Sequence, residues 1–125
     1  MRILLDTHLL LWWLDDNPSL SGQARGLIRD PENTVFVSSV SLWEIWLKQS
    51  LGKLRLPADF SKKLAAESFE SLPLLASHPR QVASLPWRHR DPFDRMLIAQ
   101  ATIEGLTVVT HDPHFKPYGV PLLLV

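Results

Sequence analysis

The sequence predicts a single three-layer α/β/α domain, residues 1–125, with a mostly parallel central sheet of four to five strands. Three observations favour this fold. Short apolar runs alternate along the chain with longer helical segments, as strands and helices do in α/β proteins. The length of 125 residues suits one domain, and 46% hydrophobic residues suffice for one core. Ten prolines divide the chain into short elements, and no repeat or linker is apparent.

The predicted strands are short and rich in aliphatic residues. Residues 2–5 form an apolar run that ends at an acid, which is typical of a buried parallel strand. Residues 34–37 are β-branched and aromatic. Residues 72–74 contain Pro73, which favours an edge or irregular strand because proline donates no ladder hydrogen bond. The last two predicted strands are residues 106–109 and 120–124.

Capping residues delimit the predicted helices. A helix over residues 7–14 is apolar on all sides and stops before Pro18. Ser21 is expected to cap a helix through residue 29, and Ser41 to open a capping box with Glu44. Asp91 is expected to cap a helix that has Pro92 at its first position and ends at Gly105. Two further helices are expected, from Asp59 or Ser61 to residue 69 and over residues 77–85.

Composition restricts the classes of function. Cysteine is absent, so disulfides and thiolate metal sites are excluded. With 13 basic and 13 acidic residues the formal net charge is zero, so any nucleic-acid contact must come from local groups of cations. Asp6 directly follows the first apolar run, which leaves no signal-peptide segment, and the run over residues 9–14 is too short to span a membrane. We therefore expect a cytoplasmic protein.

Four acids are expected at one edge of the sheet. Asp6 and Asp112 each lie just past a predicted strand, whereas Glu44 and Asp94 each lie in the first turn of a predicted helix. The carboxyl ends of parallel strands share an edge, and ligands bind in the crevice there. For Asp94 this placement follows from the pattern as a whole and not from its local sequence. At Asp6 no capping role is evident, so that acid has the weakest purely structural explanation.

Four neighbouring carboxylates require either protonation or a bound cation. Two unit charges about 4 Å apart repel by on the order of 4 kcal/mol at an effective dielectric constant near 20. Helix N-termini offset only part of that cost. Oxygen ligands without cysteine select hard cations, Mg²⁺ or Mn²⁺. Such an ion would activate a water and neutralise a phosphate, which indicates metal-assisted phosphodiester hydrolysis.

Four segments together resemble the PIN-domain ribonucleases, and among them the VapC-like toxins of bacterial toxin–antitoxin pairs. The matching residues lie in segments 4–8, 37–45, 89–101 and 109–115, of which His89 to Ala101 is the most specific. The resemblance covers nearly the whole chain. It implies a PIN-like fold, a Mg²⁺- or Mn²⁺-dependent endoribonuclease acting as a toxin, an RNA substrate, a cognate antitoxin and a homodimer, with no membrane association.

The same resemblance assigns the site residues. Asp6, Glu44, Asp94 and Asp112 match the acidic quartet that binds metal and carries catalysis, with Asp6 and Asp94 as the most direct ligands. Asp91 is either a further ligand or only the helix cap, and the sequence leaves both open. The polar residues matching the walls of the pocket are Thr7, Ser38 and Thr110.

Other residues have competing interpretations. Arg88, Arg90, Arg95 and His111 are candidate contacts to RNA phosphates, although the arginines equally suit a solvated basic face, and Arg95 equally suits an ion pair with Asp91. Some of the tryptophans Trp12, Trp13, Trp43 and Trp46 are expected at a partner interface, with packing in the core as the alternative. Two other functions stay open: a non-catalytic PIN-like domain that binds RNA or a partner, and an aspartate-based phosphatase. The latter is disfavoured by His8, where such enzymes have a second acid.

Overall fold

The computed structural model describes residues 1–87 and 91–125. In this part of the chain strands and helices alternate. The strands are β1 (Arg2–Leu5), β2 (Thr34–Ser38), β3 (Glu70–Leu72), β4 (Thr107–Thr110) and β5 (Leu122–Leu124). The helices are α1 (Thr7–Leu14), α2 (Gly22–Arg29), α3 (Ser39–Ser50), α4 (Phe60–Ala66), α5 (Ser77–Ser84) and α6 (Pro92–Glu104), with a 3₁₀ helix η1 (Pro113–Tyr118).

The five strands form one parallel sheet in the order β3-β2-β1-β4-β5, which confirms the predicted fold class. β1 lies at the centre, with Leu4 opposite Phe36 of β2 and Val108 of β4. β3 is an edge strand, as Pro73 predicted, but it covers residues 70–72 and ends just before that proline. The proline terminates the strand because it has no N–H to donate.

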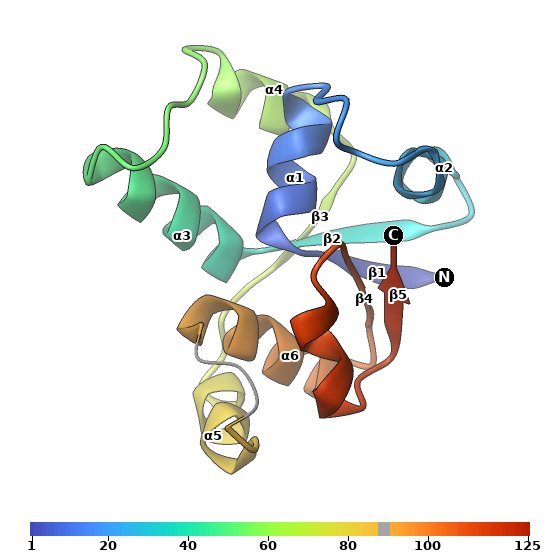
Figure 1. Cartoon of the computed structure of the whole chain (residues 1–125), viewed down its shortest axis with the longest axis vertical. Helices are drawn as coiled ribbons and strands as arrows, with labels where there is room; N and C mark the ends of the chain where they lie inside the picture. Colours follow the sequence, from blue (N-terminus) through green and yellow to red (C-terminus); the bar gives the residue numbers. More distant parts are fainter. Residues whose placement is uncertain (88–90) are drawn as a thin grey trace.

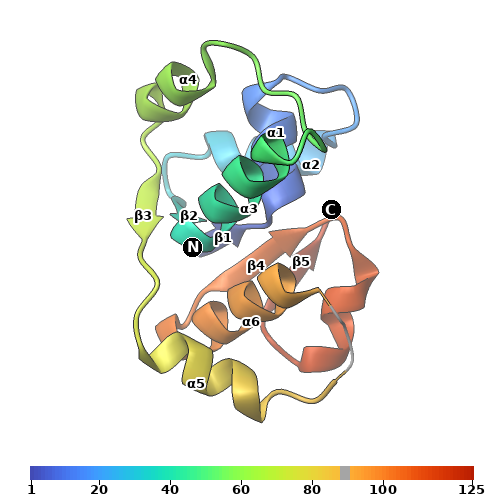
Figure 2. The ribbon, with the colours of Figure 1, turned by 90° about the vertical axis from the view of Figure 1, so that its left-hand side faces the viewer.

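Alternate residues of β1 supply two separate cores on the two faces of the sheet. Ile3 and Leu5 pack with α1, α2 and α4 on one face. Leu4 packs with α6 and η1 on the other face. This division follows from the two-residue period of a strand. Figure 2 shows the resulting layers, with α1, α2 and α4 on one side of the sheet and α5 and α6 on the other.

Helix α3 joins the two layers. Its Val40 belongs to the core beside α6, whereas its Ile45 belongs to the core beside α1. The helix begins earlier than predicted, because Ser38 and not Ser41 is the N-cap; the Ser38 hydroxyl accepts from the Val40 N–H at 3.0 Å. The expected capping box is therefore wrong, and Glu44 lies in the second turn. Its carboxylate is consequently available for a role other than capping.

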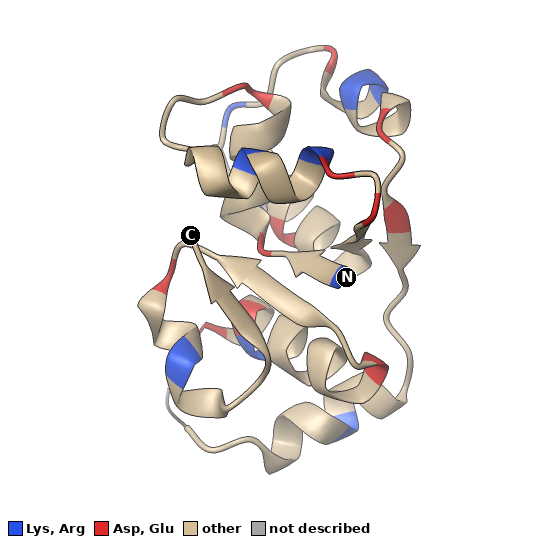
Figure 3. Cartoon of the chain, turned by 90° about the vertical axis from the view of Figure 1, so that its right-hand side faces the viewer, with Lys and Arg blue, Asp and Glu red and all other residues tan. Residues whose placement is uncertain are grey.

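Charged residues are absent from α1, β2, β4 and β5 and are spread over the other elements and the loops, and Figure 3 shows no extended segment of one sign in the part of the chain that is described. This agrees with the zero net charge. Within the same part of the chain, each helix is too short or too polar to cross a membrane.

Candidate functional site

The predicted acids lie around the point where the strand order reverses. β1 pairs with β2 on one side and with β4 on the other, and the connections from these strands cover opposite faces of the sheet. Such a reversal opens a crevice at the carboxyl ends of the strands. Asp6 directly follows β1, and Asp112 follows β4 by two residues. Figure 1 shows that the start of α1, the start of α3, α6 and η1 surround this end of the sheet.

Asp6 is buried and held by two donors. Its Oδ1 accepts from the Leu9 N–H at 2.9 Å, and its Oδ2 accepts a short hydrogen bond from the Thr110 hydroxyl. Asp6 is thus the N-cap of α1, a structural role that the sequence did not reveal. Capping and metal binding are compatible here, because a carboxylate oxygen has more than one acceptor position.

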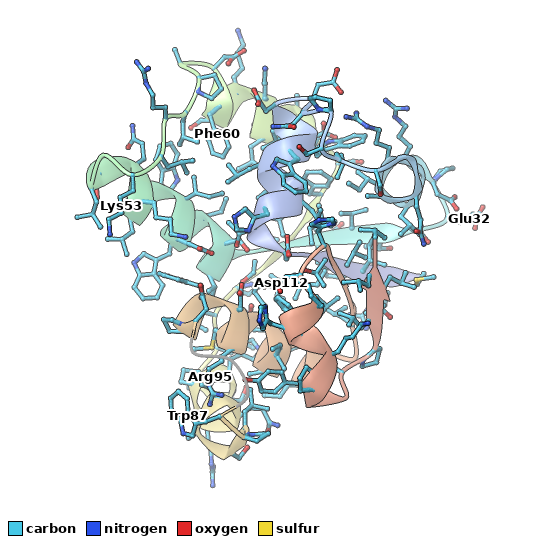
Figure 4. The ribbon with its side chains drawn as sticks, in the orientation of Figure 1. Glu32, Lys53, Phe60, Trp87, Arg95 and Asp112 are labelled. Carbon is cyan, nitrogen blue, oxygen red and sulfur yellow. The ribbon has the colours of Figure 1, made fainter. Side chains whose placement is uncertain are left out.

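Thr110 connects the first acid to the last. While its hydroxyl donates to Asp6, the same oxygen accepts from the Asp112 N–H at 3.0 Å. Asp112 in turn caps η1, accepting through Oδ1 from the His114 N–H at 2.9 Å, and it also contacts His114 Nδ1 at 2.7 Å. We call Asp6, Thr110 and Asp112 the strand side of the site. Asp112 lies at the centre of the view in Figure 4.

Burial raises the pKa of Asp6 above its ordinary value of 3.8. The hydrogen bonds from Thr110 and Leu9 and the nearby His8 act against this shift, whereas the charge of Asp112 adds to it. Desolvation is the largest contribution, so the ionised carboxylate is held at a free-energy cost. A bound cation would offset that cost.

Glu44 is the second buried acid, with 3% of its surface exposed. Its Oε2 forms an ion pair with Lys48 Nζ at 2.5 Å, one helical turn further along α3. Its Oε1 is buried and has no hydrogen-bond partner among the described residues. A buried unpaired carboxylate oxygen is costly, so this atom marks a position that suits a cation or its water.

Lys48 interacts with Glu44 and with the acids at the start of α6. Hydrogen bonding to Glu44 raises the pKa of Lys48 most strongly, burial opposes the rise, and the charges of Glu44, Asp91 and Asp94 add to it. The two helices also contact through Trp43 and Phe93, whose ring centroids are 4.9 Å apart. α6 therefore starts beside α3. We call Glu44, Lys48, Asp91 and Asp94 the helix side of the site.

Asp91 caps α6 as predicted. Its Oδ1 accepts from the N–H groups of Phe93 at 2.9 Å and Asp94 at 3.1 Å, and Pro92 occupies the first helical position. Asp94 lies at the third helical position and is partly buried. Asp91 Oδ1 is thus engaged with the main chain at the start of α6.

Hydrogen bonds between elements fix the spacing of the two sides. Thr7 donates to the Ser41 hydroxyl at 2.9 Å, which ties the residue after Asp6 to the helix that carries Glu44. The buried Ser38 donates to Gln100 Oε1 at 2.5 Å, which ties β2 and α3 to α6. Ser38 is therefore engaged in anchoring helices.

Sequence reasoning missed Lys48, Ser41 and Gln100 as parts of this arrangement. Only Lys48 carried a usable signal, its spacing of four residues from Glu44.

Two cavities meet at the site. One, of about 390 Å³, extends from Thr7, Glu44 and Lys48 toward α4. The other, of about 380 Å³, is lined by Asp6, His8, Trp12, His111, Asp112 and Pro113. His8 and Trp12 line both, so these side chains stand between the cavities. Glu44 of the helix side lines the first cavity, whereas Asp6 and Asp112 of the strand side line the second.

Arg95 is not available for RNA, which corrects the prediction for this residue. It is 2% exposed, and its guanidinium donates to the carbonyl oxygens of Val82, Leu85 and Pro86 and to the Tyr118 hydroxyl. The guanidinium carbon also lies 3.9 Å from the centre of the Trp87 ring, and Figure 4 shows the two residues side by side. Arg95 caps the end of α5 and does not pair with Asp91 as the alternative prediction held.

The remaining candidate phosphate contacts have different outcomes. Arg88 and Arg90 lie outside the described residues. His111 is exposed at the mouth of the second cavity. Its Nδ1 lies 2.8 Å from the carbonyl oxygen of Val125, so Nδ1 carries the proton, because a carbonyl oxygen only accepts. Its ring lies edge-on to Trp12 at 5.7 Å.

The donor set fits a hard divalent cation with few protein ligands. Three His, Asp or Glu side chains do not close into a ready-made cage anywhere in residues 1–87 and 91–125. Mg²⁺, however, commonly takes one or two protein carboxylates and keeps several waters. The unpaired Glu44 Oε1 and the desolvated Asp6 are oxygen donors of that kind.

Comparison with known proteins identifies the family. Residues 3–120 match the model of the PIN domain. The chain is 28% identical over 122 residues to Ribonuclease VapC22 of Mycobacterium tuberculosis, covering 95% of this chain and 93% of that protein. The fold is similar to a chain in the crystal structure of VapBC2 from Rickettsia felis bound to a promoter DNA fragment, with a TM-score of 0.75, 20% identity, and coverage of 100% of this chain and 99% of that chain. It is also similar to a chain in the crystal structure of FitAcB from Neisseria gonorrhoeae, with a TM-score of 0.68, 21% identity, and coverage of 97% of this chain and 96% of that chain. The chain therefore belongs to the PIN-domain family.

Proposed function

We propose that this protein is a divalent-metal-dependent endoribonuclease that acts as the toxin of a toxin–antitoxin pair. The observation that carries the proposal is the pair of buried carboxylates Asp6 and Glu44, whose elements α1 and α3 are joined by the Thr7–Ser41 hydrogen bond. Membership of the PIN family and the similarity to a protein named as a ribonuclease support the same activity. The similar structures of VapBC and FitAcB support a cognate antitoxin as partner.

Asp6 and Asp94 would hold Mg²⁺ or Mn²⁺ most directly, with Glu44 and Asp112 as further ligands or partners of its waters. When bound, the cation supplies charge neutralisation at the phosphate and activation of the attacking water. Thr110 fixes the rotamer of Asp6 and the main chain of Asp112. Asp91 keeps α6 aligned through its cap. No side-chain nucleophile is needed, because a water activated by the cation would attack the phosphate.

Substrate and partner would use different surfaces. Among the described residues, His8, Trp12 and His111 line the second cavity, where an aromatic ring can stack on an unpaired base. On α3, Trp43 and Trp46 are 58% and 43% exposed, next to the exposed Leu47 and Leu51. Exposed aromatic residues of this kind suit a protein interface, so we place a homodimer or antitoxin contact on this face of α3.

The test is cleavage of a 5′-labelled single-stranded RNA by the purified chain. We expect internal cleavage with Mn²⁺ or Mg²⁺, none in EDTA, and none by Asp6→Asn. Asp59→Asn, at an exposed acid in a surface ion pair with Lys63, is the matched control and should cleave normally. Cleavage by the Asp6→Asn chain in EDTA would refute the proposal.

A further inference from the structure

Lys48 is the cation that the described structure places at the acidic site. Its ammonium nitrogen lies 2.5 Å from Glu44 Oε2, and the Lys48 side chain is 40% exposed whereas that of Glu44 is 4% exposed. A second ion pair with the same spacing, Lys63 with Asp59, has a distance of 3.8 Å and both side chains about half exposed. The Lys48 pair is therefore shorter, and its carboxylate is buried whereas that of Asp59 is exposed.

The surroundings of Lys48 extend beyond one ion pair. The carboxylates of Asp91 and Asp94, from the start of α6, also act on its ammonium group. An isolated helix-surface ion pair would have only its partner on the same helix. Lys48 instead has three acids near it, Glu44 on α3 and Asp91 and Asp94 at the start of α6, all of which are candidate metal ligands. It occupies the kind of position that a divalent cation requires.

Glu44 is only half satisfied by Lys48. Oε2 has the ammonium group, whereas Oε1 is buried without a partner in the described part of the chain. A lysine ammonium is a compact point charge on a flexible stem, so it can leave one oxygen without unfolding the helix. A divalent cation that approached Oε1 would be repelled by the ammonium group as long as that group stayed at Oε2.

We propose that Lys48 is a built-in counter-cation of the acidic site, which holds Glu44 in the metal-free chain and must release it when a divalent cation binds. This rests on the proposed function, because it takes the acids as the metal site. Because Lys48 competes for Glu44, the apparent association constant for the metal equals the intrinsic constant multiplied by the fraction of time for which Glu44 is released. If the ion pair is closed for roughly nine-tenths of the time, removing the ammonium group tightens metal binding about tenfold.

The test compares Lys48→Met with Lys63→Met, which removes the other lysine of the same spacing. Mn²⁺ binding to the full chain is measured by titration calorimetry, and the thermal midpoint is measured with and without Mn²⁺. For Lys48→Met we expect an about tenfold lower dissociation constant, a lower midpoint without metal and a larger rise of the midpoint on adding Mn²⁺. Lys63→Met should match the parent chain in all three.

Lys48→Arg separates charge from packing. It keeps the cation at Glu44, so its Mn²⁺ affinity should stay near that of the parent chain. Equal Mn²⁺ affinities for the parent chain and Lys48→Met would overturn the counter-cation while leaving the metal site intact. Absence of Mn²⁺ binding from both chains, as expected for Asp6→Asn, would overturn the metal site and the role of Lys48 with it.

Discussion

The two sides of the acidic site differ in how their buried carboxylates are held. On the strand side both oxygens of Asp6 have donors, from the main chain of α1 and from Thr110 on β4. On the helix side Glu44 has one flexible lysine at one oxygen and no partner at the other within the described chain. The strand side is thus preorganised by rigid elements, whereas the helix side can rearrange. A divalent cation that bound here would have one rigidly held ligand, Asp6, and a second, Glu44, that Lys48 must first release.

The largest expected effect comes from removing the fixed ligand. Asp6→Asn should lower the rate of RNA cleavage by on the order of 10³-fold, because a metal ion contributes several kcal/mol of transition-state stabilisation. The measurement is single-turnover cleavage at an Mn²⁺ concentration that saturates the parent chain. Circular dichroism must show a folded chain. A loss smaller than that of Asp112→Asn would contradict the assignment of Asp6 as the principal ligand of the strand side.

The second prediction tests the rigidity of the strand side. Thr110→Val removes the donor to Asp6 and the acceptor of the Asp112 N–H, so the free energy of unfolding should fall by about 1–3 kcal/mol. Urea denaturation measures this change. Thr107→Val, on the same strand but away from the acids, is the control and should cost less. Equal losses for the two variants would show that Thr110 does not organise the site.

The third prediction concerns Asp91 on the helix side. Asp91→Ser retains a capping hydroxyl but loses the charge, whereas Asp91→Ala loses both. Loss of the cap should cost about 1 kcal/mol of stability in Asp91→Ala only. If Asp91 is only a cap, Mn²⁺ affinity by calorimetry stays the same in Asp91→Ser. A clear loss of affinity in that variant would make Asp91 a ligand.

The fourth prediction concerns how the difference in stability between Asp6→Asn and the parent chain varies with pH in metal-free protein. The pKa of Asp6 is raised in the folded chain. Between the ordinary value of 3.8 and that raised value, the folded chain therefore binds a proton that the unfolded chain releases. Asp6 therefore reduces stability at neutral pH, and this reduction disappears as pH falls from the raised pKa to the ordinary value of 3.8. Thermal midpoints of Asp6→Asn minus the parent chain should be positive at pH 7 and shrink in acid. A difference independent of pH would contradict this.

Much of the fold was predictable because its signals are local. The strand runs, the cap at Asp91, the helix end at Gly105 and the edge position of the strand at Pro73 all follow from residue type and short-range spacing. The start of α3 was predicted wrongly because two serines, Ser38 and Ser41, both suit a cap, and only Ser38 is placed at the end of β2. Local sequence does not distinguish such alternatives when tertiary contacts decide.

Arg95 shows the same limit for a charged side chain. Next to two acids and two further arginines in sequence, it suggested a phosphate contact. The fold instead turns it toward the end of α5, where carbonyl oxygens that lie 9 to 13 residues away accept its donors. No spacing rule for a single helix predicts that contact, because it depends on how α5 packs against α6.

The sequence by itself determined the family and the parallel α/β architecture, because strand ends and helix caps follow from residue type and order, and it supplied the four acids as a prediction. Only the tertiary structure decided how those acids are held. The hydrogen bond from Thr110 to Asp6 joins residues 104 positions apart in sequence. The charges of Asp91 and Asp94 at the start of α6 act on Lys48 of α3. Such pairings depend on the order of strands and the packing of helices, which bring together residues far apart in the chain.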